Sequence, residues 1–216
     1  MTTLTAPTDA RRRRDPEATR AAILEAAEEL FLAAGPADTP MSRIARRAGV
    51  TKSLIHHHFG SKEGLWSEIK KRHFGKYFEV QKLMLSSSEG TPELLRDSLV
   101  AYFRFLQSDP RSVRFMSWRF VETDDDPCLA QEDELFELGM ERIREGQENG
   151  RLRADVEPIS MIKVFLAMAL HWFQSKPLLC QILGPETDTD ALEETYLEDI
   201  VKIFLEGVRP REGSAR

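Results

Sequence analysis

The sequence predicts an all-α protein of about nine helices, and three observations support that prediction. Apolar residues recur at helical spacing in one segment after another, helix-start signals punctuate the chain, and no stretch alternates apolar and polar residues long enough to indicate a strand. The 216 residues, 41% apolar and 31% charged, can bury a core as one large domain or two small ones. This composition excludes collagen-like, low-complexity and wholly disordered chains.

The first four helices are marked by their caps. Asp15 precedes Pro16, which joins an N-cap carboxylate to a proline at the first helical position, and Gly35 ends the same helix. From Ile23 to Ala34, apolar residues follow at offsets of 4, 7, 8 and 11, which place them on one face. The next three helices are expected to begin at Thr39-Pro40, Thr51 and Ser61, and to end at Ala48, about His58 and roughly Leu85.

Four of the other five helices follow the same punctuation, in which a proline stands behind a polar capping residue, and the last opens at the acidic residues of 188–190 without a proline. The acidic run 124–126 before Pro127 is interpreted as a loop and cap, because carboxylates there favour the helix dipole. These helices are expected near residues 92–107 and 110–121, from that loop to Asn149, from Pro158 onward, and from 188–190 to a point before Pro210.

Positive charge gathers at the front of the chain. Residues 1–75 hold 13 Lys and Arg against 9 Asp and Glu, whereas residues 76–216 hold 17 against 27, which together give the net charge of −6. The division suggests a small part that faces a polyanion and a larger part that faces something else. Four of the positive charges form the run Arg11–Arg14, which a solvated tail also explains.

Residues 39–62 have the length and punctuation of a helix-turn-helix, in which two short helices meet at Gly49. Ala45 and Ala48 are small enough to let the second helix approach closely, and such a motif carries the start of its second helix into the DNA major groove. The expected core of the motif is Ile44, Ala45, Ala48, Val50, Ile55 and Phe59. The positions expected to point outward from the second helix are Lys52, Ser53, Leu54, His56 and His57.

This stretch resembles the DNA-binding region of TetR-family transcriptional regulators over about residues 17–65. The resemblance implies an N-terminal three-helix helix-turn-helix DNA-binding domain joined to a larger helical ligand-binding and dimerisation domain. The matching segments are Ile44-Ala45, Ala48-Gly49-Val50-Thr51, the run from Ile55 to Phe59, and Ser61-Lys62, with a similar family loop at 150–155. We therefore expect a basic N-terminal arm at 1–16, the DNA-binding domain at 17–75, and the ligand-binding and dimerisation domain at 76–216.

The resemblance also assigns roles on double-stranded operator DNA. Lys52 can take guanine O6 or N7, and Leu54 can pack on a thymine methyl. His58 can instead be a packed helix-end residue, and Arg11–Arg14 can either enter the minor groove or stay a disordered tail. The residues that match backbone-holding positions are Ser42, Arg43, Thr51, His56, His58 and Lys62, and those near base edges are Lys52, Ser53, Leu54 and His57.

One position departs from the family pattern, which usually has a phosphate-contacting tyrosine where this chain has His56. Histidine also donates to phosphate, more strongly when protonated, and the ordinary pKa of its side chain lies near 6.5. We therefore predict that operator affinity falls between about pH 6 and about pH 8 by more than salt effects explain. Replacing His56 with tyrosine should remove that dependence.

The last two helices predict contacts on more than one side. Between Ile159 and Phe173 only Ser160, Lys163 and His171 are polar or charged, and a helix that is apolar nearly all round must be covered on several sides. A homodimer through the last two helices is expected, because two such helices suit a two-fold four-helix interface. It would read palindromic half-sites about 34–36 Å apart, or a multiple of that. A thick monomer core is the alternative, and His171 is interpreted as a core histidine.

Methionine and aromatic residues are frequent in the middle helices. Such side chains can line an adaptable ligand cavity, although they also fill ordinary cores. The resemblance implies a small-molecule ligand whose binding favours one of two dimer spacings. The candidate pocket residues are Met84, Phe103, Phe115, Trp118, Phe136, Met140, Met168 and Trp172.

Other functional classes find little support in the sequence. The chain contains no GxSxG, P-loop, GxGxxG or HExxH motif, so neither an enzyme nor a cofactor is expected. His56, His57 and His58 point about 100° apart on a helix and cannot converge on one metal ion. Cys128 and Cys180 have neither disulfide-framework nor metal spacing, and are interpreted as small buried hydrophobes in a reducing cytoplasm, with redox sensors as the alternative.

With the resemblance, the sequence predicts a cytoplasmic, homodimeric transcriptional repressor that a small molecule releases from a palindromic operator. A membrane partner is not expected, because the longest apolar run, residues 164–170, is shorter than the about 20 residues a membrane helix needs. The N-terminus also shows no apolar signal segment. The alternatives are an activator or a DNA-binding protein that takes no ligand.

Overall fold

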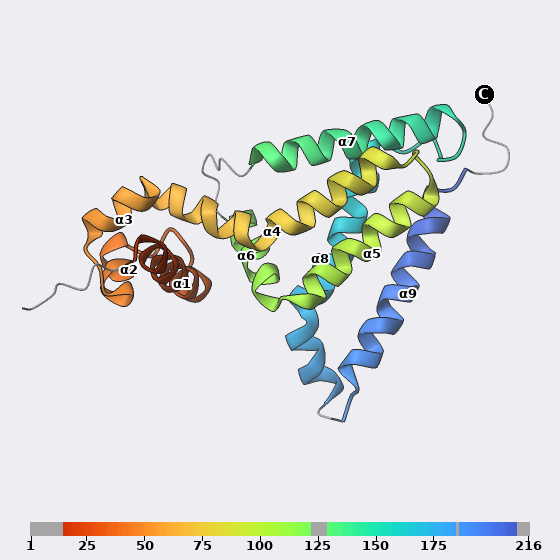
Figure 1. Cartoon of the computed structure of the whole chain (residues 1–216). Helices are drawn as coiled ribbons and strands as arrows, with labels where there is room; N and C mark the ends of the chain where they lie inside the picture. The colour runs from red at the N-terminus through yellow and green to blue at the C-terminus, as the bar shows by residue number, and fades with distance from the viewer. Residues whose placement is uncertain (1–14, 122–128, 185, 211–216) are drawn as a thin grey trace, which may run out of the picture. The chain divides into compact units, whose positions relative to one another are not determined.

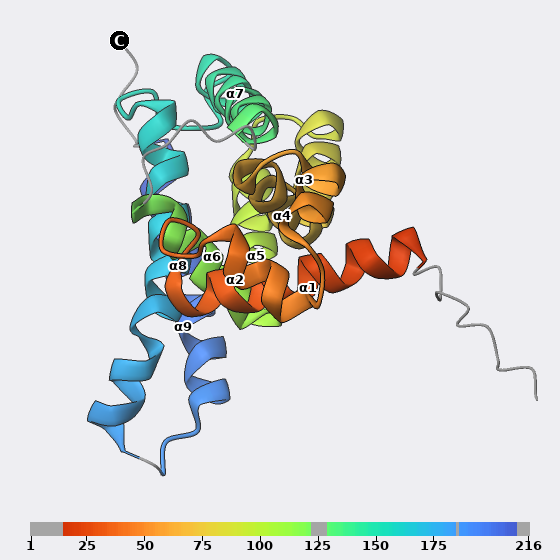
Figure 2. The same cartoon turned by 90° about the vertical axis from the view of Figure 1, so that its left-hand side faces the viewer.

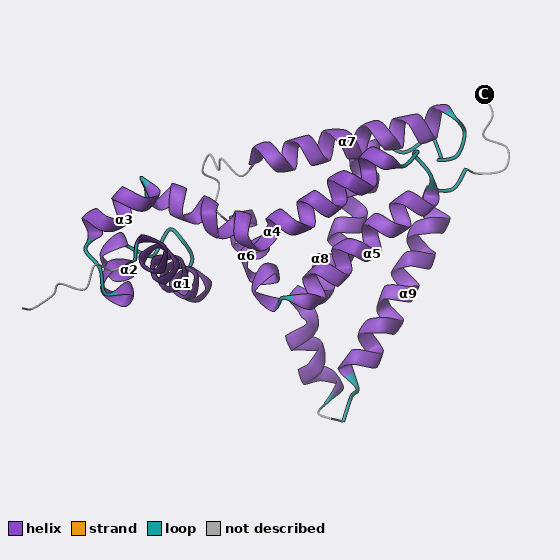
Figure 3. Cartoon of the chain, in the orientation of Figure 1, coloured by secondary structure: helices purple, strands orange, loops and turns teal. Residues whose placement is uncertain are grey.

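The computed structural model describes residues 15–121, 129–184 and 186–210, whose regular secondary structure consists of nine α-helices and no strand (Figure 3). The all-α prediction is confirmed. The chain divides into two compact units, Met1–Trp66 and Ser67–Arg216. The division falls within a helix, earlier in the chain than the border expected after residue 75.

The first unit contains three helices and the start of a fourth. They are α1 (Pro16–Ala34), α2 (Met41–Ala48), α3 (Lys52–Phe59) and α4 (Lys62–Ser87), the last of which continues into the second unit (Figure 1). Three of the predicted caps are made by backbone N–H groups that donate to a side-chain oxygen. These are Glu17 to Asp15 at 3.0 Å, Leu54 to Thr51 at 3.2 Å, and Gly64 to Ser61 at 3.1 Å.

Thr39 does not cap α2, as its position before Pro40 had suggested. Met41 is the first residue of that helix, so Pro40 itself takes the cap position and offers no side-chain acceptor. The buried Thr39 hydroxyl turns back instead and donates to the carbonyl oxygen of Gly35 at 2.7 Å. It thereby satisfies a carbonyl just after the end of α1, where helical partners run out.

The core of the first unit is built from all three of its complete helices. Ile23 and Phe31 of α1, Ile44 of α2 and Ile55 of α3 are fully buried, and α2 packs against both α1 and α3. Trp66 lies edge-on to Phe31, with ring centroids 5.4 Å apart, which adds an aromatic contact to the packing. In the predicted core of the motif, Ile44, Ala45 and Ile55 are buried, and Ala48, Val50 and Phe59 are half-buried.

The second unit is organised around one long helix. Its helices after α4 are α5 (Pro92–Ser108), α6 (Pro110–Val121), α7 (Leu129–Glu148), α8 (Pro158–Leu183) and α9 (Thr189–Val208). Because α8 packs against α5, α6, α7 and α9, the chain itself covers several sides of this apolar helix. The views in Figures 1 and 2 show α8 and α9 side by side, running in opposite directions.

The loop before α8 holds the end of α9. Gly150 opens it with a φ of 69°, a left-handed conformation that glycine adopts without a steric penalty. Arg153 donates from its backbone N–H to the carbonyl of Val208 at 2.9 Å and from its guanidinium to that of Gly207 at 3.0 Å. The loop therefore supplies donors to the last carbonyls of α9, which have no partner within the helix.

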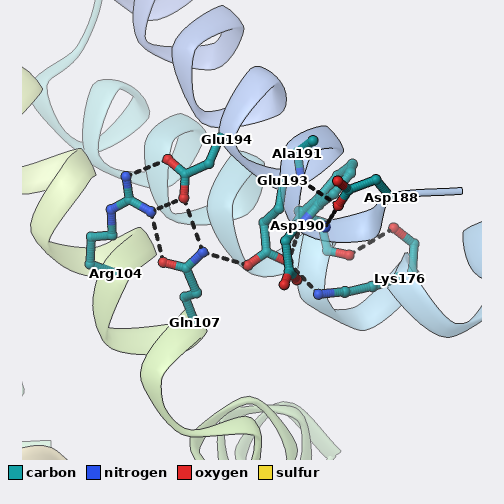
Figure 4. A network of polar contacts seen from close by, with 10 residues as sticks. Arg104, Gln107, Lys176, Asp188, Asp190, Ala191, Glu193 and Glu194 are labelled. Atoms are coloured by element: carbon teal, nitrogen blue, oxygen red, sulfur yellow. Dashed lines mark hydrogen bonds and ion pairs between the residues drawn. The ribbon is translucent and has the colours of Figure 1, made fainter.

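A buried carboxylate joins α5, α8 and α9 (Figure 4). Glu193 is 2% exposed and accepts hydrogen bonds from the Trp172 indole at 3.2 Å, the Lys176 ammonium at 2.6 Å and the Gln107 amide at 2.7 Å. Burial by itself would raise the pKa of Glu193, but these three donors outweigh it and lower that pKa below the usual value. The group therefore stays ionised inside the protein.

The interpretation of His171 as a core histidine is wrong, because its side chain is exposed. It lies on the same side of α8 as Val164, which is 49% exposed. Its chain neighbours Leu170 and Trp172 are buried, so α8 is apolar on both its inner and outer sides, and helical periodicity does not tell which apolar stripe faces inward.

Candidate nucleic-acid interface and cavity

The turn between α2 and α3 fixes where α3 points. Gly49 adopts a left-handed conformation (φ 66°, ψ 36°), and the next N–H, that of Val50, donates to the carbonyl of Ala45 at 3.0 Å. Thr51 then caps α3, and Ile55 anchors one face of that helix in the core. The remaining faces of α3 are consequently free to point outward.

Most side chains predicted to reach base edges lie on those outer faces. Lys52, Ser53 and His57 are exposed, and Leu54 is half-buried. Within the described part of the chain, the Lys52 ammonium has no hydrogen-bond or ion-pair partner. A cation held on a rigid helix without a partner is available to a base edge or a phosphate.

The residues predicted to hold the DNA backbone fall into two groups. Ser42, Arg43, Thr51 and His56 are exposed, whereas His58 and Lys62 are half-buried. The ring of His58 lies 5.6 Å from that of His57 and 6.1 Å from that of Phe59, so it packs among aromatic neighbours at the helix end. These contacts suit the alternative of a packed helix-end residue for His58.

One ring nitrogen of His56 already makes a hydrogen bond within the protein. Its Nδ1 lies 2.8 Å from the carbonyl oxygen of Gly60, and because a carbonyl only accepts, Nδ1 carries the hydrogen. In the neutral ring Nε2 then has no hydrogen and cannot donate to a phosphate oxygen. Protonation adds that hydrogen, so this geometry makes any phosphate contact through Nε2 depend on the charged form.

Lys62 binds backbone carbonyl groups that lie far from it in the sequence. Its ammonium donates to the carbonyl of Pro36 at 2.9 Å and to that of Ala37 at 3.3 Å. The side chain therefore ties the start of α4 to the turn after α1, while an ammonium has a third hydrogen left for a phosphate. Sequence reasoning missed this tether, because nothing local in the sequence pairs these segments.

The helix-turn-helix segment carries one sign of charge. Residues 41–62 contain five Lys and Arg and no Asp or Glu. Outside that segment, Glu29 of α1 pairs with Arg47 at 2.6 Å, and the guanidinium of Arg20 lies 5.2 Å from the centre of the Phe59 ring. Arg20 was missed by the sequence analysis. A strip without carboxylates is the electrostatic footprint expected of a polyanion site.

Three predicted features lie outside the described residues. These are the Arg11–Arg14 run, the acidic loop and cap at 124–126, and Cys128. Cys180 is described, half-buried and not in a disulfide.

The second unit contains a cavity of about 90 Å³, which is lined by α4, α5, α6, α7 and α8. Its wall is mostly apolar, as small-molecule sites usually are. The aromatic residues of the wall are Tyr77, Phe78, Tyr102, Phe136 and Phe165, and its polar residues are Gln81, Ser98 and Glu132 besides the two tyrosines.

Of the eight residues predicted to line a pocket, Phe136 lies on the wall of this cavity. The other seven are not among its described lining residues. Phe103 packs on Phe173 at 4.8 Å, Phe115 on His73 at 4.8 Å, and Trp172 stacks on Tyr196 at 4.3 Å beside a much smaller second cavity. The remaining four are Met84, Trp118, Met140 and Met168, all half-buried.

The polar residues of the cavity wall were not predicted, because the sequence prediction considered methionine and aromatic residues. Gln81 donates to the backbone carbonyl of Ser98 at 3.0 Å, so α4 and α5 are joined beside the cavity. Burial raises the pKa of the Tyr77 hydroxyl well above its usual value, and the nearby Tyr102 and Glu132 raise it further. One signal was present in the sequence, since Tyr77 and Gln81 stand four residues apart on one helix face.

The described residues contain neither a cluster of metal ligands nor a membrane-spanning helix. No three His, Cys, Asp or Glu side chains come together there in a way that could hold a metal ion. In the same residues, none of the helices combines the length and apolar character that crossing a membrane requires.

Family profiles of known proteins match segments of both units. The sequence profile described as "Bacterial regulatory proteins, tetR family" matches residues 23–69, and that described as "Tetracyclin repressor-like, C-terminal domain" matches residues 95–198. The chain is 29% identical over 192 residues to the HTH-type transcriptional repressor SCO4008 of Streptomyces coelicolor, which covers 84% of this chain and 93% of that protein.

Solved structures share the fold. NalD, the secondary repressor of the MexAB-OprM multidrug efflux pump in Pseudomonas aeruginosa, superposes with a TM-score of 0.66 at 23% identity, covering 91% of this chain and 98% of NalD. AibR, solved in complex with isovaleryl coenzyme A and operator DNA, gives a TM-score of 0.64 at 20% identity, covering 86% and 97% of the two chains.

Proposed function

The chain belongs to the TetR family of bacterial DNA-binding transcriptional regulators, which are not enzymes, and on that premise we propose that it is a homodimeric repressor released from a palindromic operator by a small molecule. The observation that supports DNA reading most directly is the exposed side of α3 inside the carboxylate-free segment 41–62. Such a protein works where the chromosome is, in the cytoplasm.

The proposed recognition helix is α3, and its first residues would contact the bases. Lys52, Ser53 and His57 face outward there and would meet base edges, with Leu54 against a thymine methyl. Contacts to phosphates would come from the following exposed or half-buried residues: Ser42, Arg43, Thr51, His56, His58 and Lys62.

The proposed dimer interface is the outer side of α8 and α9. Val164, Leu178 (58%), Ile182 (69%) and Ile203 (64%) expose large apolar side chains there. Apolar residues gathered on neighbouring helices favour burial against a second copy, in the two-fold four-helix arrangement predicted from the sequence.

Release by a ligand is proposed through α4 and α6. The cavity is lined by Tyr77 of α4 and Met116 of α6, and α4 is the helix that leads back to the first unit. The start of α6 is held to α4 by His73, whose Nδ1 lies 3.1 Å from the Asp109 carboxylate. A ligand that fits one arrangement of these helices better than another shifts the balance between them.

The test is footprinting of the purified protein on genomic DNA, followed by a metabolite screen for loss of operator binding. We expect protected sites with two-fold symmetry and release by at least one compound. Protection without any symmetric site would contradict the dimer, and operator binding that no compound changes would favour a ligand-independent regulator. A compound that strengthens binding and raises transcription would favour an activator.

A further inference from the structure

We propose that the cavity of the second unit opens at the seam between α4 and α7, and that the ion pair of Lys82 with Glu134 is the gate through which a ligand enters. This inference rests on the proposed function of the cavity as the ligand site. Three features support it: the size of the cavity, the unequal fastening of α4 along its two sides, and the position of the ion pair beside the cavity wall.

The cavity is small for an organic ligand. Its volume is about 90 Å³. By comparison, an engineered protein cavity of about 150 Å³ holds a benzene molecule, and sites for drug-sized ligands are on the order of 300 Å³ or more. A small molecule therefore has to move part of the wall, and it enters at the seam that opens at the least cost in free energy.

On the side of α5, α4 is fastened by contacts inside the unit. The buried Gln81 amide donates to the backbone carbonyl of Ser98 at 3.0 Å, and Tyr77 stacks on Phe105 with ring centroids 4.6 Å apart. The helices α5, α6 and α7 in turn pack closely against α8. Opening any of these seams would expose apolar surface or separate a buried polar group from its partner, and both cost free energy.

On the side of α7, α4 is fastened at the surface. Within the described part of the chain, α7 packs closely against α8 but not against α4. The Lys82 ammonium lies 2.6 Å from the Glu134 carboxylate, and the two side chains are 48% and 58% exposed. An ion pair in contact with water contributes little stability and is weakened by salt, so it can break and form again while the unit stays folded.

The ion pair stands where the cavity wall meets the surface. Lys82 lies one turn after Phe78 and one turn before Leu85 on the same side of α4. Both of these apolar residues line the cavity, and so does Leu135 of α7, which directly follows Glu134. Lys82 and Glu134 are not among the described lining residues, so the pair bridges the seam from outside the cavity.

The experiment measures how fast a small uncharged thiol reagent, N-ethylmaleimide, reaches a cysteine on the cavity wall of the DNA-free, full-length protein. Cys128 and Cys180 are first replaced by serine, and the nearly isosteric Ser98→Cys then supplies the thiol on the wall. Labelling requires the wall to open, so its rate follows the population of the open form. Leu99→Cys, at a fully buried position that does not line the cavity, reports unfolding of the unit instead.

The labelling rate is compared between gate variants and control variants. The gate variants are Lys82→Gln, Glu134→Gln and the two combined, each of which breaks the ion pair. The control variants are Lys76→Gln and Glu137→Gln, which remove exposed charges of the same two helices outside that pair.

We expect each gate variant to label Ser98→Cys about threefold faster than the protein with the intact pair. The double variant should be no faster than either single one, because all three lose the same interaction. High salt should speed labelling by a similar factor when the pair is intact and should not change the rate in the gate variants. The control variants, and Leu99→Cys in every background, should keep their original rates.

The proposal is overturned if breaking the pair leaves the labelling of Ser98→Cys unchanged, if the two single effects multiply in the double variant, or if Leu99→Cys accelerates equally. It is also overturned if His73→Phe, which removes the tie between α4 and the start of α6, speeds labelling while the gate variants do not. A second cysteine on the wall, Met116→Cys of α6, keeps the test valid should Ser98→Cys fail to fold.

Failure of this inference is distinct from failure of the proposed function, because the labelling experiment uses neither DNA nor the natural ligand. A protein that protects an operator but labels at a rate independent of the ion pair loses the gate alone. A protein whose labelling depends on the ion pair but that protects no DNA loses the repressor function alone.

Discussion

The two units use polar side chains in opposite ways. Around α3 the polar side chains face outward, and their capping bonds are local, such as Thr51 to Leu54 and His56 to Gly60. In the second unit polar side chains from distant segments meet inside, as Gln107 and Glu193 do. The first arrangement presents groups to a partner, and the second fixes helices to one another, so substitutions should separate binding from stability.

The largest expected effect is on the stability of the second unit. Glu193→Ala removes the acceptor shared by Trp172, Lys176 and Gln107, and should lower the free energy of unfolding by about 3 kcal/mol. Chemical denaturation measures the loss. Glu194→Ala removes the neighbouring exposed carboxylate, which pairs with Arg104, and should cost much less. Equal losses in the two variants would contradict a role for burial.

The stability that Glu193 contributes should also depend on pH. Because the pKa of Glu193 is lowered by folding, the unfolded chain takes up this proton first as the pH falls below the ordinary value of 4.5. The stability that Glu193 contributes is therefore complete above that pH and is lost as the pH falls through the lower, folded pKa. Wild-type stability should fall more steeply in that acid range than that of Glu193→Ala.

The next largest effect concerns DNA binding by the first unit. Lys52→Ala should cost about 2 kcal/mol of binding to the preferred operator and little on unrelated DNA, because a base contact is lost and the helix remains anchored by Ile55. Gel-shift titration on both DNAs measures the difference, with the exposed Lys76 of the second unit replaced as a control. A uniform loss on all DNAs would assign Lys52 to phosphate instead.

Lys62 is the residue that breaks the simple division, because it is at once a tether and a candidate phosphate contact. Lys62→Ala should lower the salt slope of DNA binding by about 0.9 and the unfolding free energy by about 1 kcal/mol. Arg43→Ala should change the slope by a similar amount and leave stability unchanged, since within the described residues its guanidinium has no partner. If Lys62→Ala changes stability alone, the lysine is a tether and nothing more.

The smallest effect is the pH dependence at His56. With Nδ1 bonded to Gly60, the ring donates to phosphate through Nε2 when protonated, so operator affinity should fall roughly fivefold from about pH 6 to about pH 8. His56→Tyr should remove this dependence, and His57→Tyr should keep it. A slope that persists in His56→Tyr assigns the titration to another group.

The sequence predicted the helices well because their signals are local. The caps at Asp15, Thr51 and Ser61 lie within three residues of the amides they accept from, so the order of residues alone specifies them. Thr39 was misjudged because its alternative partner, the carbonyl of Gly35, lies in the preceding turn of chain. Competition between two nearby partners is settled by packing, which sequence spacing does not contain.

The cavity was beyond sequence reasoning for a different reason. Residues from 77 to 166 contribute to it through five helices, and which face of each helix points inward depends on how all of them pack. Phe136 was anticipated from its residue type, while Glu132 looked like an ordinary acidic residue in the first turn of a helix.

By itself, the order of residues determined the helices, the helix-turn-helix and the charge of the surface around it, because each depends on neighbours a few positions apart. Tertiary structure alone decided the cavity wall, the ionised Glu193 inside the second unit and the tether of Lys62. The hydrogen bonds at Glu193 and Lys62 join groups between 17 and 86 positions apart, and such contacts form when the buried surface of the whole unit outweighs the entropy of closing the chain between them.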